Sequence, residues 1–384
     1  MALGIYVGVG SKARKIKKLY VGVANKARLI KKVYVGVNGK AKQVWPGNRI
    51  IKIETPYADL SEAKTVASAA TINNYALFAG GTRTSSSSFL GEPSDVVNAF
   101  NSSLTRSIPT ALSVARSCLV ATTIGNYVLF GGGSTGMFGS TAAVDAYNTS
   151  LTRSTPTALS EARTYFKATK IGNYALFGGG DTHTYSNQYV TTVDAYNTSL
   201  TRSTPTALSA GRRDLGATTI GNYALFGGGY NGTNCLSTID TYNTSLTRGT
   251  ATALSQVRND MGVVSIGNYA LFGGGNNEDS NNWNFFTIVD AYNTSLTRSS
   301  ATALSQARGD IATVVFNNYA LFGGGRINDG TSTVLEGYNS SLTKIILEPF
   351  TLALTHASAA VTGNYVLFGA GNSISTGFEK YTIG

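Results

Sequence analysis

The sequence predicts an all-β fold, a β-propeller of seven blades, and three observations lead to this prediction. Glycine is frequent, with 44 residues in 384, and charged residues make up 13% of the chain. That composition is typical of short strands joined by tight turns. The string Asn-Tyr-Ala/Val-Leu-Phe followed by glycines occurs seven times, and a shorter, strongly basic repeat precedes all seven copies.

The long repeat defines the fold, because each copy has the size of one propeller blade. A unit such as 159–203 contains four short apolar segments separated by turn signals. Gly172-Asn173 predicts a two-residue hairpin turn, and Asn197-Thr198-Ser199 predicts a turn held by side-chain-to-backbone hydrogen bonds. The units are marked by the tyrosines Tyr75, Tyr127, Tyr174, Tyr223, Tyr269, Tyr319 and Tyr365.

The two ends of the long-repeat region are expected to close the ring. The last unit supplies three strands, roughly 354–362, 365–371 and 377–383. The segment 49–56, which stands before the first unit, resembles 344–349, the predicted fourth strand of the unit before the last. We therefore expect the N-terminal strand to complete the last blade and to remove the open sheet edge.

The long repeat resembles the kelch repeat. The apolar strand of that family, which ends in two glycines, corresponds to Leu176-Phe177-Gly178-Gly179 and its counterparts. The resemblance implies a seven-bladed kelch-like propeller over residues 48–384. One departure is regular, because the tryptophan usual on the fourth strand is replaced by Arg106, Arg153, Arg202, Arg248, Arg298 and Lys344. The details of inter-blade packing therefore stay open.

The basic repeat occupies residues 1–47 and is expected to form a separate small β-meander. Tyr-Val-Gly-Val recurs every 14 residues, at Tyr6, Tyr20 and Tyr34. Whether each copy is one long strand or a hairpin stays open. The module holds eleven Lys and Arg and no Asp or Glu, since Glu54 is the first acidic residue. The whole net charge of +11 therefore belongs to the module, and a neutral propeller is disfavoured as a nucleic-acid-binding domain.

The basic repeat resembles short N-terminal repeats of tail-associated proteins from phages and prophages of Gram-positive bacteria. The resemblance implies a non-enzymatic virion or tail-particle protein that is made in the bacterial cytoplasm without a signal peptide. Its residues 1–47 would attach to an acidic particle protein, with homo-oligomers possible through the same module. The residues expected to carry the attachment are Lys12, Arg14, Lys17, Lys18, Arg28, Lys31 and Lys32.

Under the same resemblance, the propeller would recognise a host-surface glycan or protein without inserting into a membrane. Two alternatives remain, an intracellular kelch-type interaction scaffold and a kelch-fold carbohydrate-active enzyme. Teichoic acid and nucleic acid also stay open as anionic targets of the basic module, with nucleic acid the less favoured.

One face of the disc is expected to bind the ligand. The loops after the glycine triplets differ between units, whereas the hairpin turns on the other face are nearly identical. Variable loops on a rigid scaffold, with aromatic rings among them, are typical of a binding surface. The expected contact residues are Trp283, Phe285, Phe286, Asp279, Tyr185, Tyr189, Asp181, Tyr230, Phe138 and Arg326.

Other repeated polar residues favour structural roles. Asp145, Asp194, Asp240 and Asp290 recur beside arginines, which predicts a set of structural ion pairs. Asp214, Asp260 and Asp310 share one position in three units, where cation binding is the less favoured hypothesis. No nucleophile, base and orienting acid occur together in a single loop, so no catalytic residue, metal or cofactor is expected. The recurring Asn-x-Ser/Thr strings are interpreted as turns, with no glycosylation expected.

Overall fold

The computed structural model describes residues 50–54, 58–85, 88–182, 188–279, 282–371 and 375–384, together with six strands between residues 6 and 45. The six strands and the segments 84–90 and 278–282 are described at most by their backbone. The chain divides into two compact units, Met1–Ile51 with Thr382–Gly384, and Lys52–Tyr381. Every regular element described is a strand, and no membrane-spanning helix is found among the described residues.

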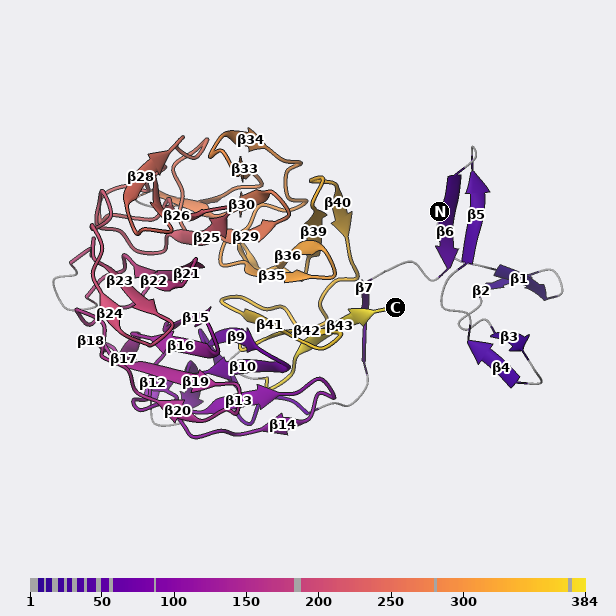
Figure 1. Cartoon of the computed structure of the whole chain (residues 1–384), viewed down its shortest axis with the longest axis horizontal. Coiled ribbons are helices and arrows are strands. Elements are labelled where there is room, and N and C mark those ends of the chain that lie inside the picture. Colours follow the sequence, from indigo (N-terminus) through magenta and orange to yellow (C-terminus); the bar gives the residue numbers. More distant parts are fainter. Residues whose placement is uncertain are drawn as a thin grey trace. The chain divides into compact units, whose positions relative to one another are not determined.

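Seven four-stranded antiparallel sheets stand in a ring, which confirms the predicted seven-bladed propeller (Figure 1). Blade 1 consists of β9 (Ser68–Ile72), β10 (Tyr75–Ala79), β13 (Val97–Phe100) and β14 (Arg106–Ser107). Blade 2 consists of β15 (Val120–Ile124), β16 (Tyr127–Gly131), β19 (Val144–Asn148) and β20 (Arg153–Ser154). Blade 3 consists of β21 (Lys167–Ile171), β22 (Tyr174–Gly178), β23 (Val193–Asn197) and β24 (Arg202–Ser203). Blade 4 consists of β25 (Gly216–Ile220), β26 (Tyr223–Gly227), β27 (Ile239–Asn243) and β28 (Arg248–Ala251). Blade 5 consists of β29 (Gly262–Ile266), β30 (Tyr269–Gly273), β33 (Val289–Asn293) and β34 (Arg298–Ser300). Blade 6 consists of β35 (Ala312–Phe316), β36 (Tyr319–Gly323), β39 (Leu335–Asn339) and β40 (Lys344–Ile346). In each blade the first strand lies nearest the centre of the ring.

Blade 7 is closed by the N-terminal strand, as the sequence predicted. Its sheet runs β41 (Ser358–Thr362), β42 (Tyr365–Gly369), β43 (Glu379–Ile383) and β7 (Ile50–Lys52). The register differs from the one that the likeness of 49–56 to 344–349 suggested. The N–H of Ile53 donates to Lys380 O (3.0 Å), and Lys52 meets Glu379 as Lys344 meets Glu336, both at 2.8 Å. The closing lysine is therefore Lys52, three residues beyond the aligned Arg49.

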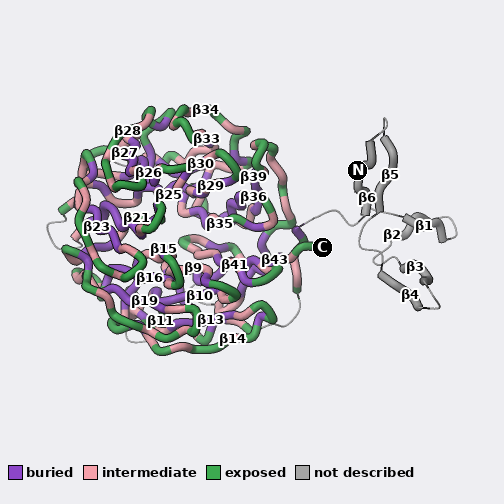
Figure 2. The backbone as a smooth tube through the Cα atoms, in the orientation of Figure 1, coloured by how far each residue is buried: buried purple, intermediate pink, exposed green. Residues whose placement is uncertain are grey.

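The core lies between neighbouring blades. One buried cluster joins Leu77 and Ala79 of blade 1 to Val128, Phe130 and Tyr147 of blade 2, and equivalent clusters follow around the ring. The buried residues run along the middle strands (Figure 2). In each of blades 2 to 7 the repeated phenylalanine and tyrosine pack edge to face. In blade 3, for example, the ring centres of Phe177 and Tyr196 lie 5.7 Å apart and the ring planes meet at 85°.

The Asn-x-Ser/Thr strings are turns, as predicted. In blade 3, Asn197 Oδ1 accepts hydrogen bonds from the backbone N–H groups of Ser199 and Thr201, both at 3.0 Å. Leu200 then takes a positive φ of 61°. The same two hydrogen bonds recur at Asn101, Asn148, Asn243, Asn293 and Asn339.

The N-terminal unit contains three separate hairpins. They are β1 (Tyr6–Val9) with β2 (Lys12–Lys15), β3 (Tyr20–Val23) with β4 (Lys26–Leu29), and β5 (Val33–Val37) with β6 (Lys40–Trp45). Each 14-residue repeat is thus one hairpin, and within the described residues no strand pairs with a neighbouring hairpin. The expected continuous meander is therefore not present in the described strands.

Candidate functional site

The two faces of the disc differ in construction. The Gly-Asn and Asn-Thr-Ser turns lie on one face, and the loops after the glycine triplets lie on the other, together with the connections to the next blade. Several of these loops form short extra sheets on the loop face. They are β11 (Thr82–Ser85) with β12 (Ser88–Pro93) and β8 (Lys64–Thr65), β17 (Ser134–Gly136) with β18 (Gly139–Ser140), β31 (Asn276–Asp279) with β32 (Asn282–Phe285), and β37 (Arg326–Ile327) with β38 (Gly330–Thr331).

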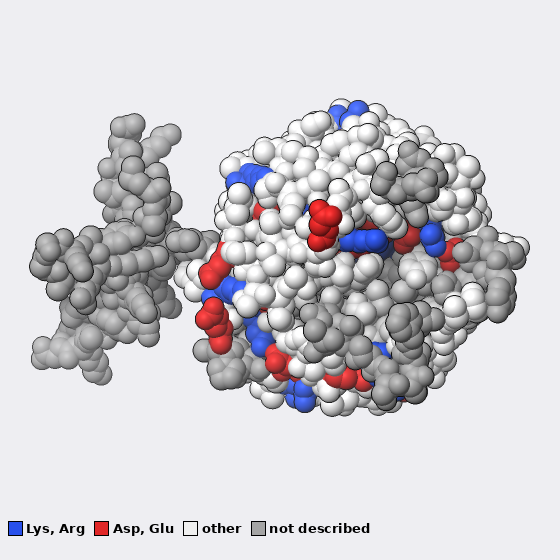
Figure 3. Space-filling view, turned by 180° about the vertical axis from the view of Figure 1, so that it is seen from behind, with Lys and Arg blue, Asp and Glu red and all other residues white. Residues whose placement is uncertain are grey.

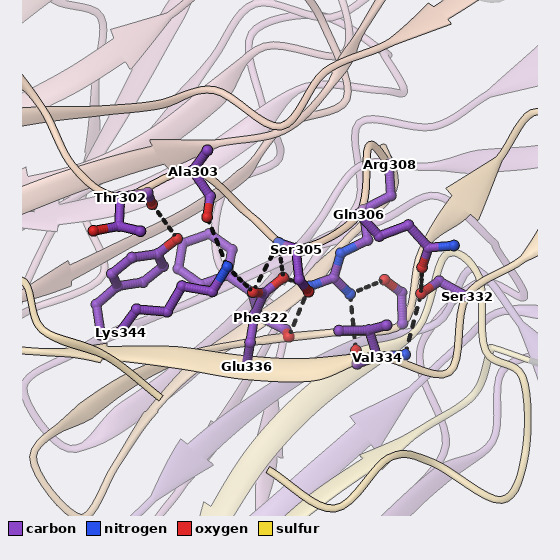
Figure 4. Close-up of polar contacts among 12 residues, drawn as sticks. Thr302, Ala303, Ser305, Gln306, Arg308, Phe322, Ser332, Val334, Glu336 and Lys344 are labelled. Carbon is purple, nitrogen blue, oxygen red and sulfur yellow. Dashed lines mark hydrogen bonds and ion pairs between the residues drawn. The ribbon is translucent and has the colours of Figure 1, made fainter. Parts of the chain in front are cut away.

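A buried ion pair holds the loop-face connection in each of blades 2 to 6. In blade 6, Arg308 lies 2.7 Å from Glu336 and also donates to the carbonyl oxygens of Gly324 and Val334 (Figure 4). The N–H of Ser305 donates to the same carboxylate. The other fully buried pairs, at 2.7–2.8 Å, are Arg116–Asp145, Arg163–Asp194, Arg212–Asp240 and Arg258–Asp290. The predicted structural ion pairs are confirmed.

The basic residues that replace the kelch tryptophan bind these same carboxylates from the outer strand. In blade 3, Asp194 sits between Arg163 at 2.7 Å and Arg202 at 2.8 Å. Arg248, Arg298 and Lys344 repeat this contact at 2.8–2.9 Å, and Arg153 lies 3.7 Å from Asp145. In blades 3 to 6 a buried carboxylate therefore lies between two cations of its own blade.

Two residues beyond each buried basic side chain, the backbone turns toward the centre of the ring in one repeated conformation. The residue there has a φ between 49° and 54° in all seven blades. We call these seven positions the girdle: Val66, Cys118, Tyr165, Asp214, Asp260, Asp310 and His356. Backbone hydrogen bonds link neighbouring members, for example Asp260 N–H to Asp214 O (3.0 Å) and Asp310 N–H to Asp260 O (2.9 Å).

The girdle surrounds a pocket of about 370 Å³ at the centre of the disc. All seven members line this pocket, and basic and aromatic residues add to the wall: Lys167, Arg213, Arg326, Phe166 and Trp283. On the face that Figure 3 shows, basic and acidic side chains gather in a band across the middle of the disc. Pockets that combine convergent polar groups with aromatic rings are typical of ligand sites.

Three adjacent blades give the girdle an acidic arc. Asp214 lies 3.3 Å from Arg213, Asp310 lies 3.3 Å from His356, and Asp260 accepts a hydrogen bond from Asn276 at 3.2 Å. Burial, and then the neighbouring Asp260 carboxylate, raise the pKa of Asp214 and of Asp310 well above the usual range. Burial lowers the pKa of His356, and Asp260 partly offsets this effect.

The opposite arc of the girdle is less polar. Cys118 and Tyr165 are hydrogen-bonded there, in a contact that lies inside the pocket wall. Burial raises the pKa of the Cys118 thiol, and the neighbouring Cys118, followed by burial, raises the pKa of the Tyr165 hydroxyl. Neither Cys118 nor Cys235 forms a disulfide in the described part of the chain, where no three His, Cys, Asp or Glu side chains are grouped to hold a metal ion.

The structure brings two of the predicted ligand-binding residues into the pocket. The guanidinium carbon of Arg326 lies 4.1 Å from the ring centre of Trp283, and Phe285 lies almost parallel to Trp283 at 6.5 Å. Tyr189 and Tyr230 form an edge-to-face pair at 6.0 Å outside the pocket lining. These aromatic residues therefore pack partly on one another and on arginines.

The remaining predicted residues are scattered. Phe138 is 47% exposed at a loop tip, and the backbone N–H of Phe286 donates to Gly275 O. Asp181 does not reach the surface, because its backbone pairs with Thr164 and its fully buried carboxylate lies 3.4 Å from Arg213. Tyr185, the side chain of Asp279, the side chains of Lys12, Arg14 and Arg28, and all of Lys17, Lys18, Lys31 and Lys32 lie outside the described residues.

Sequence reasoning missed the girdle as a unit. It identified the shared position of Asp214, Asp260 and Asp310 but did not connect Cys118 or His356 with that position. The missing signal was positional, because each member stands two residues after Lys64, Arg116, Arg163, Arg212, Arg258, Arg308 or Leu354. This position carries five residue types in the seven blades, namely Val, Cys, Tyr, Asp and His.

The chain matches no protein-family model and no curated protein. It is similar to solved structures, among them one described as "Structure of YjhT", with a TM-score of 0.58 and 12% sequence identity. The match covers 76% of this chain and 99% of that one. At this identity the likeness shows the fold, and the chain accordingly has the fold of a kelch-like β-propeller.

Proposed function

We propose that the chain is a non-enzymatic binding protein of a phage tail or tail-like particle, whose propeller recognises a carbohydrate or protein on the host surface. The girdle is the observation that carries this proposal. Seven backbones of one conformation present residues of five types, namely Val, Cys, Tyr, Asp and His, to one pocket. A repeated backbone whose residue types change around a cavity is typical of a recognition site.

The pocket lining favours a hydroxyl-rich ligand. The carboxylates of Asp214, Asp260 and Asp310 accept hydrogen bonds, whereas Lys167 and Arg326 donate them. Charged and neutral acceptors beside donors suit the hydroxyl groups of a sugar, each of which both donates and accepts. The volume of about 370 Å³ lies within the range of small-ligand pockets.

The basic module supplies the attachment in this proposal. Residues 1–47 carry the whole positive excess, so the natural partner is an acidic protein of the particle. The chain would be made in the bacterial cytoplasm and would reach the host surface as part of the particle, without entering the membrane. Neighbouring genes for tail proteins, or the chain itself in purified particles, would support this origin.

Glycan-array binding of the full chain tests the recognition role. We expect binding to a host cell-wall saccharide that falls at least about tenfold in Asp260→Asn and in Arg326→Ala, because each removes a polar pocket contact. Lys170→Ala is the matched control, since Lys170 is exposed at the end of β21 nearest the turn face. Equal binding by all three variants would place recognition outside the pocket.

A carbohydrate-active enzyme is the second candidate, and one observation favours it. Two carboxyl groups with raised pKa values, Asp214 and Asp310, lie in one pocket with His356, and such groups often serve in acid–base catalysis. Incubating the full chain with any glycan it binds, and analysing the products by mass spectrometry, separates the candidates. Turnover that is lost in Asp214→Asn and Asp310→Asn would establish the enzyme and overturn the non-enzymatic proposal.

A further inference from the structure

The three N-terminal hairpins share an unusual combination of open edges and uniform charge. In the described part of the chain, each is a sheet of two strands with no third strand beside it. Both edges of each hairpin therefore present backbone N–H and C=O groups that no described strand pairs. A lone two-stranded sheet is marginally stable in water, so a third strand would stabilise each one.

The register places the cations at the same positions in every hairpin. Lys12 lies opposite Val9 and Arg14 opposite Val7. The second hairpin repeats this with Lys26–Val23 and Arg28–Val21, and the third with Lys40–Val37 and Lys42–Val35. In each hairpin two cations therefore stand at alternate positions of the second strand, each opposite a valine of the first. The three hairpins thus offer three equivalent binding units.

Charge decides which partner can use these edges. A second copy of the chain brings no acidic side chain to these cations, because residues 1–53 contain no Asp or Glu, and pairing through the second strands would place lysines and arginines beside lysines and arginines. Like charges on adjacent strands destabilise a sheet. Nucleic acid or teichoic acid would neutralise the cations, but neither offers a row of N–H and C=O groups in strand register. An acidic β-strand of another protein supplies both.

We propose that each hairpin accepts an acidic β-strand of a partner protein along an open edge, so that one chain takes up to three such strands. This inference rests on the attachment role in the proposed function and names the kind of contact. Backbone hydrogen bonds would provide the affinity, and acidic residues at every second position of the added strand would match the cations at alternate positions of the hairpin's second strand. Three linked sites would give an avidity above that of any single hairpin.

Calorimetric titration of the full chain with a short peptide of alternating Val and Glu tests the proposal. We expect binding to three equivalent sites, and loss of binding when alternate peptide amides are N-methylated, because methylation removes the donors that strand pairing needs. A peptide with Lys in place of Glu is expected not to bind. Binding that survives N-methylation, or binding of heparin alone, would overturn strand addition in favour of a polyanion site.

Charge reversal locates the sites. The double variant Lys12→Glu with Arg14→Glu is expected to reduce the three sites to two, and the same change in the second hairpin to reduce them equally. Lys170→Glu on the propeller is the control for a charge reversal away from the hairpins and should retain three sites. If the chain does not bind the peptide but still binds the glycan, only the strand-addition proposal is refuted. If the chain binds the peptide normally but not the glycan, only the proposed recognition role is refuted.

Discussion

The ammonium group of Lys52 lies 2.8 Å from the carboxylate of Glu379, and this contact joins the first strand of the propeller to the last. Lys52 also donates to Pro349 O at 2.9 Å, so it fixes the connection that enters blade 7. Leu354 stands where blades 2 to 6 carry their buried arginine. The closing strand therefore supplies the cation for the buried Glu379 carboxylate, whereas each equivalent carboxylate of blades 2 to 6 also has a buried arginine.

Replacing Lys52 with methionine is expected to lower the free energy of unfolding by about 3 kcal/mol, because it leaves a buried carboxylate without this cation. Chemical denaturation of the full chain measures the effect. Arg153→Met is the matched control, because Asp145 keeps Arg116 at 2.8 Å when the more distant Arg153 is removed. Equal losses in the two variants would show that closure does not depend on the Lys52 charge.

The fold was predictable because each of the seven repeats contains the turn and strand signals of one blade. Gly-Asn turns, Asn-Thr-Ser turns and apolar strands each specify their own geometry, and repetition makes a ring the only way to bury them all. The register of β7 was less predictable, since Ile50, Ile51 and Ile53 offer similar apolar contacts in several alignments. The buried charge of Glu379 selects the register, and that requires knowing which carboxylate lacks an arginine.

The site was predictable only in part, for a related reason. Trp283 and Arg326 were identified because aromatic and basic residues in variable loops are conspicuous. Asp181 looked like another loop residue, yet its backbone bridges to Thr164 and Tyr189 draw it inward. The girdle escaped notice because its members share a backbone conformation but not a residue type, and no residue pattern displays that conformation.

Asp214→Asn is expected to stabilise the protein at pH 8, with the gain disappearing as the pH falls toward 4. The folded-state pKa of Asp214 is raised above the unfolded value of 3.8, so the folded state binds a proton more readily. Stability therefore falls as the pH rises from the unfolded pKa through the folded one, and the amide removes this loss. Urea unfolding across this pH range provides the measurement.

The opposite result at pH 8, a variant less stable than the wild type, would mean that the ion pair with Arg213 outweighs burial. His356→Gln should act in the other direction and serves as a comparison. Its folded pKa is lowered, so the wild type loses stability as the pH falls below the unfolded pKa near 6.5, and the variant should not.

The pair Arg163 and Asp194 is expected to be strongly coupled. Arg163→Met and Asp194→Asn each leave one buried group without its main partner, and each should cost about 3 kcal/mol. The double variant should cost less than the sum, by at least about 1 kcal/mol, because the second change removes the group that the first left unpaired. Additive losses in denaturant unfolding would argue that the two side chains act independently.

Each turn asparagine is expected to stabilise the protein through its side-chain oxygen Oδ1, which accepts two backbone hydrogen bonds. Asn197→Ala removes the acceptor of two backbone N–H groups at an exposed turn, and we expect a loss of about 1 kcal/mol. Asn197→Asp keeps an oxygen in the same place and should cost less. Thermal unfolding of both variants provides the comparison, and an equal loss would show that the amide nitrogen or the residue shape matters instead.

Val66 is the girdle member least suited to its backbone, because a β-branched residue at a φ of 49° is strained. Val66→Asn should stabilise the protein by about 1 kcal/mol, since asparagine tolerates this region far better. Val66→Ala separates the causes, because alanine removes the side-chain contacts and keeps much of the backbone penalty. Denaturant unfolding of both variants is the measurement. If asparagine destabilises as much as alanine, the contacts of the valine side chain outweigh its strain, and the girdle is held by packing at this blade.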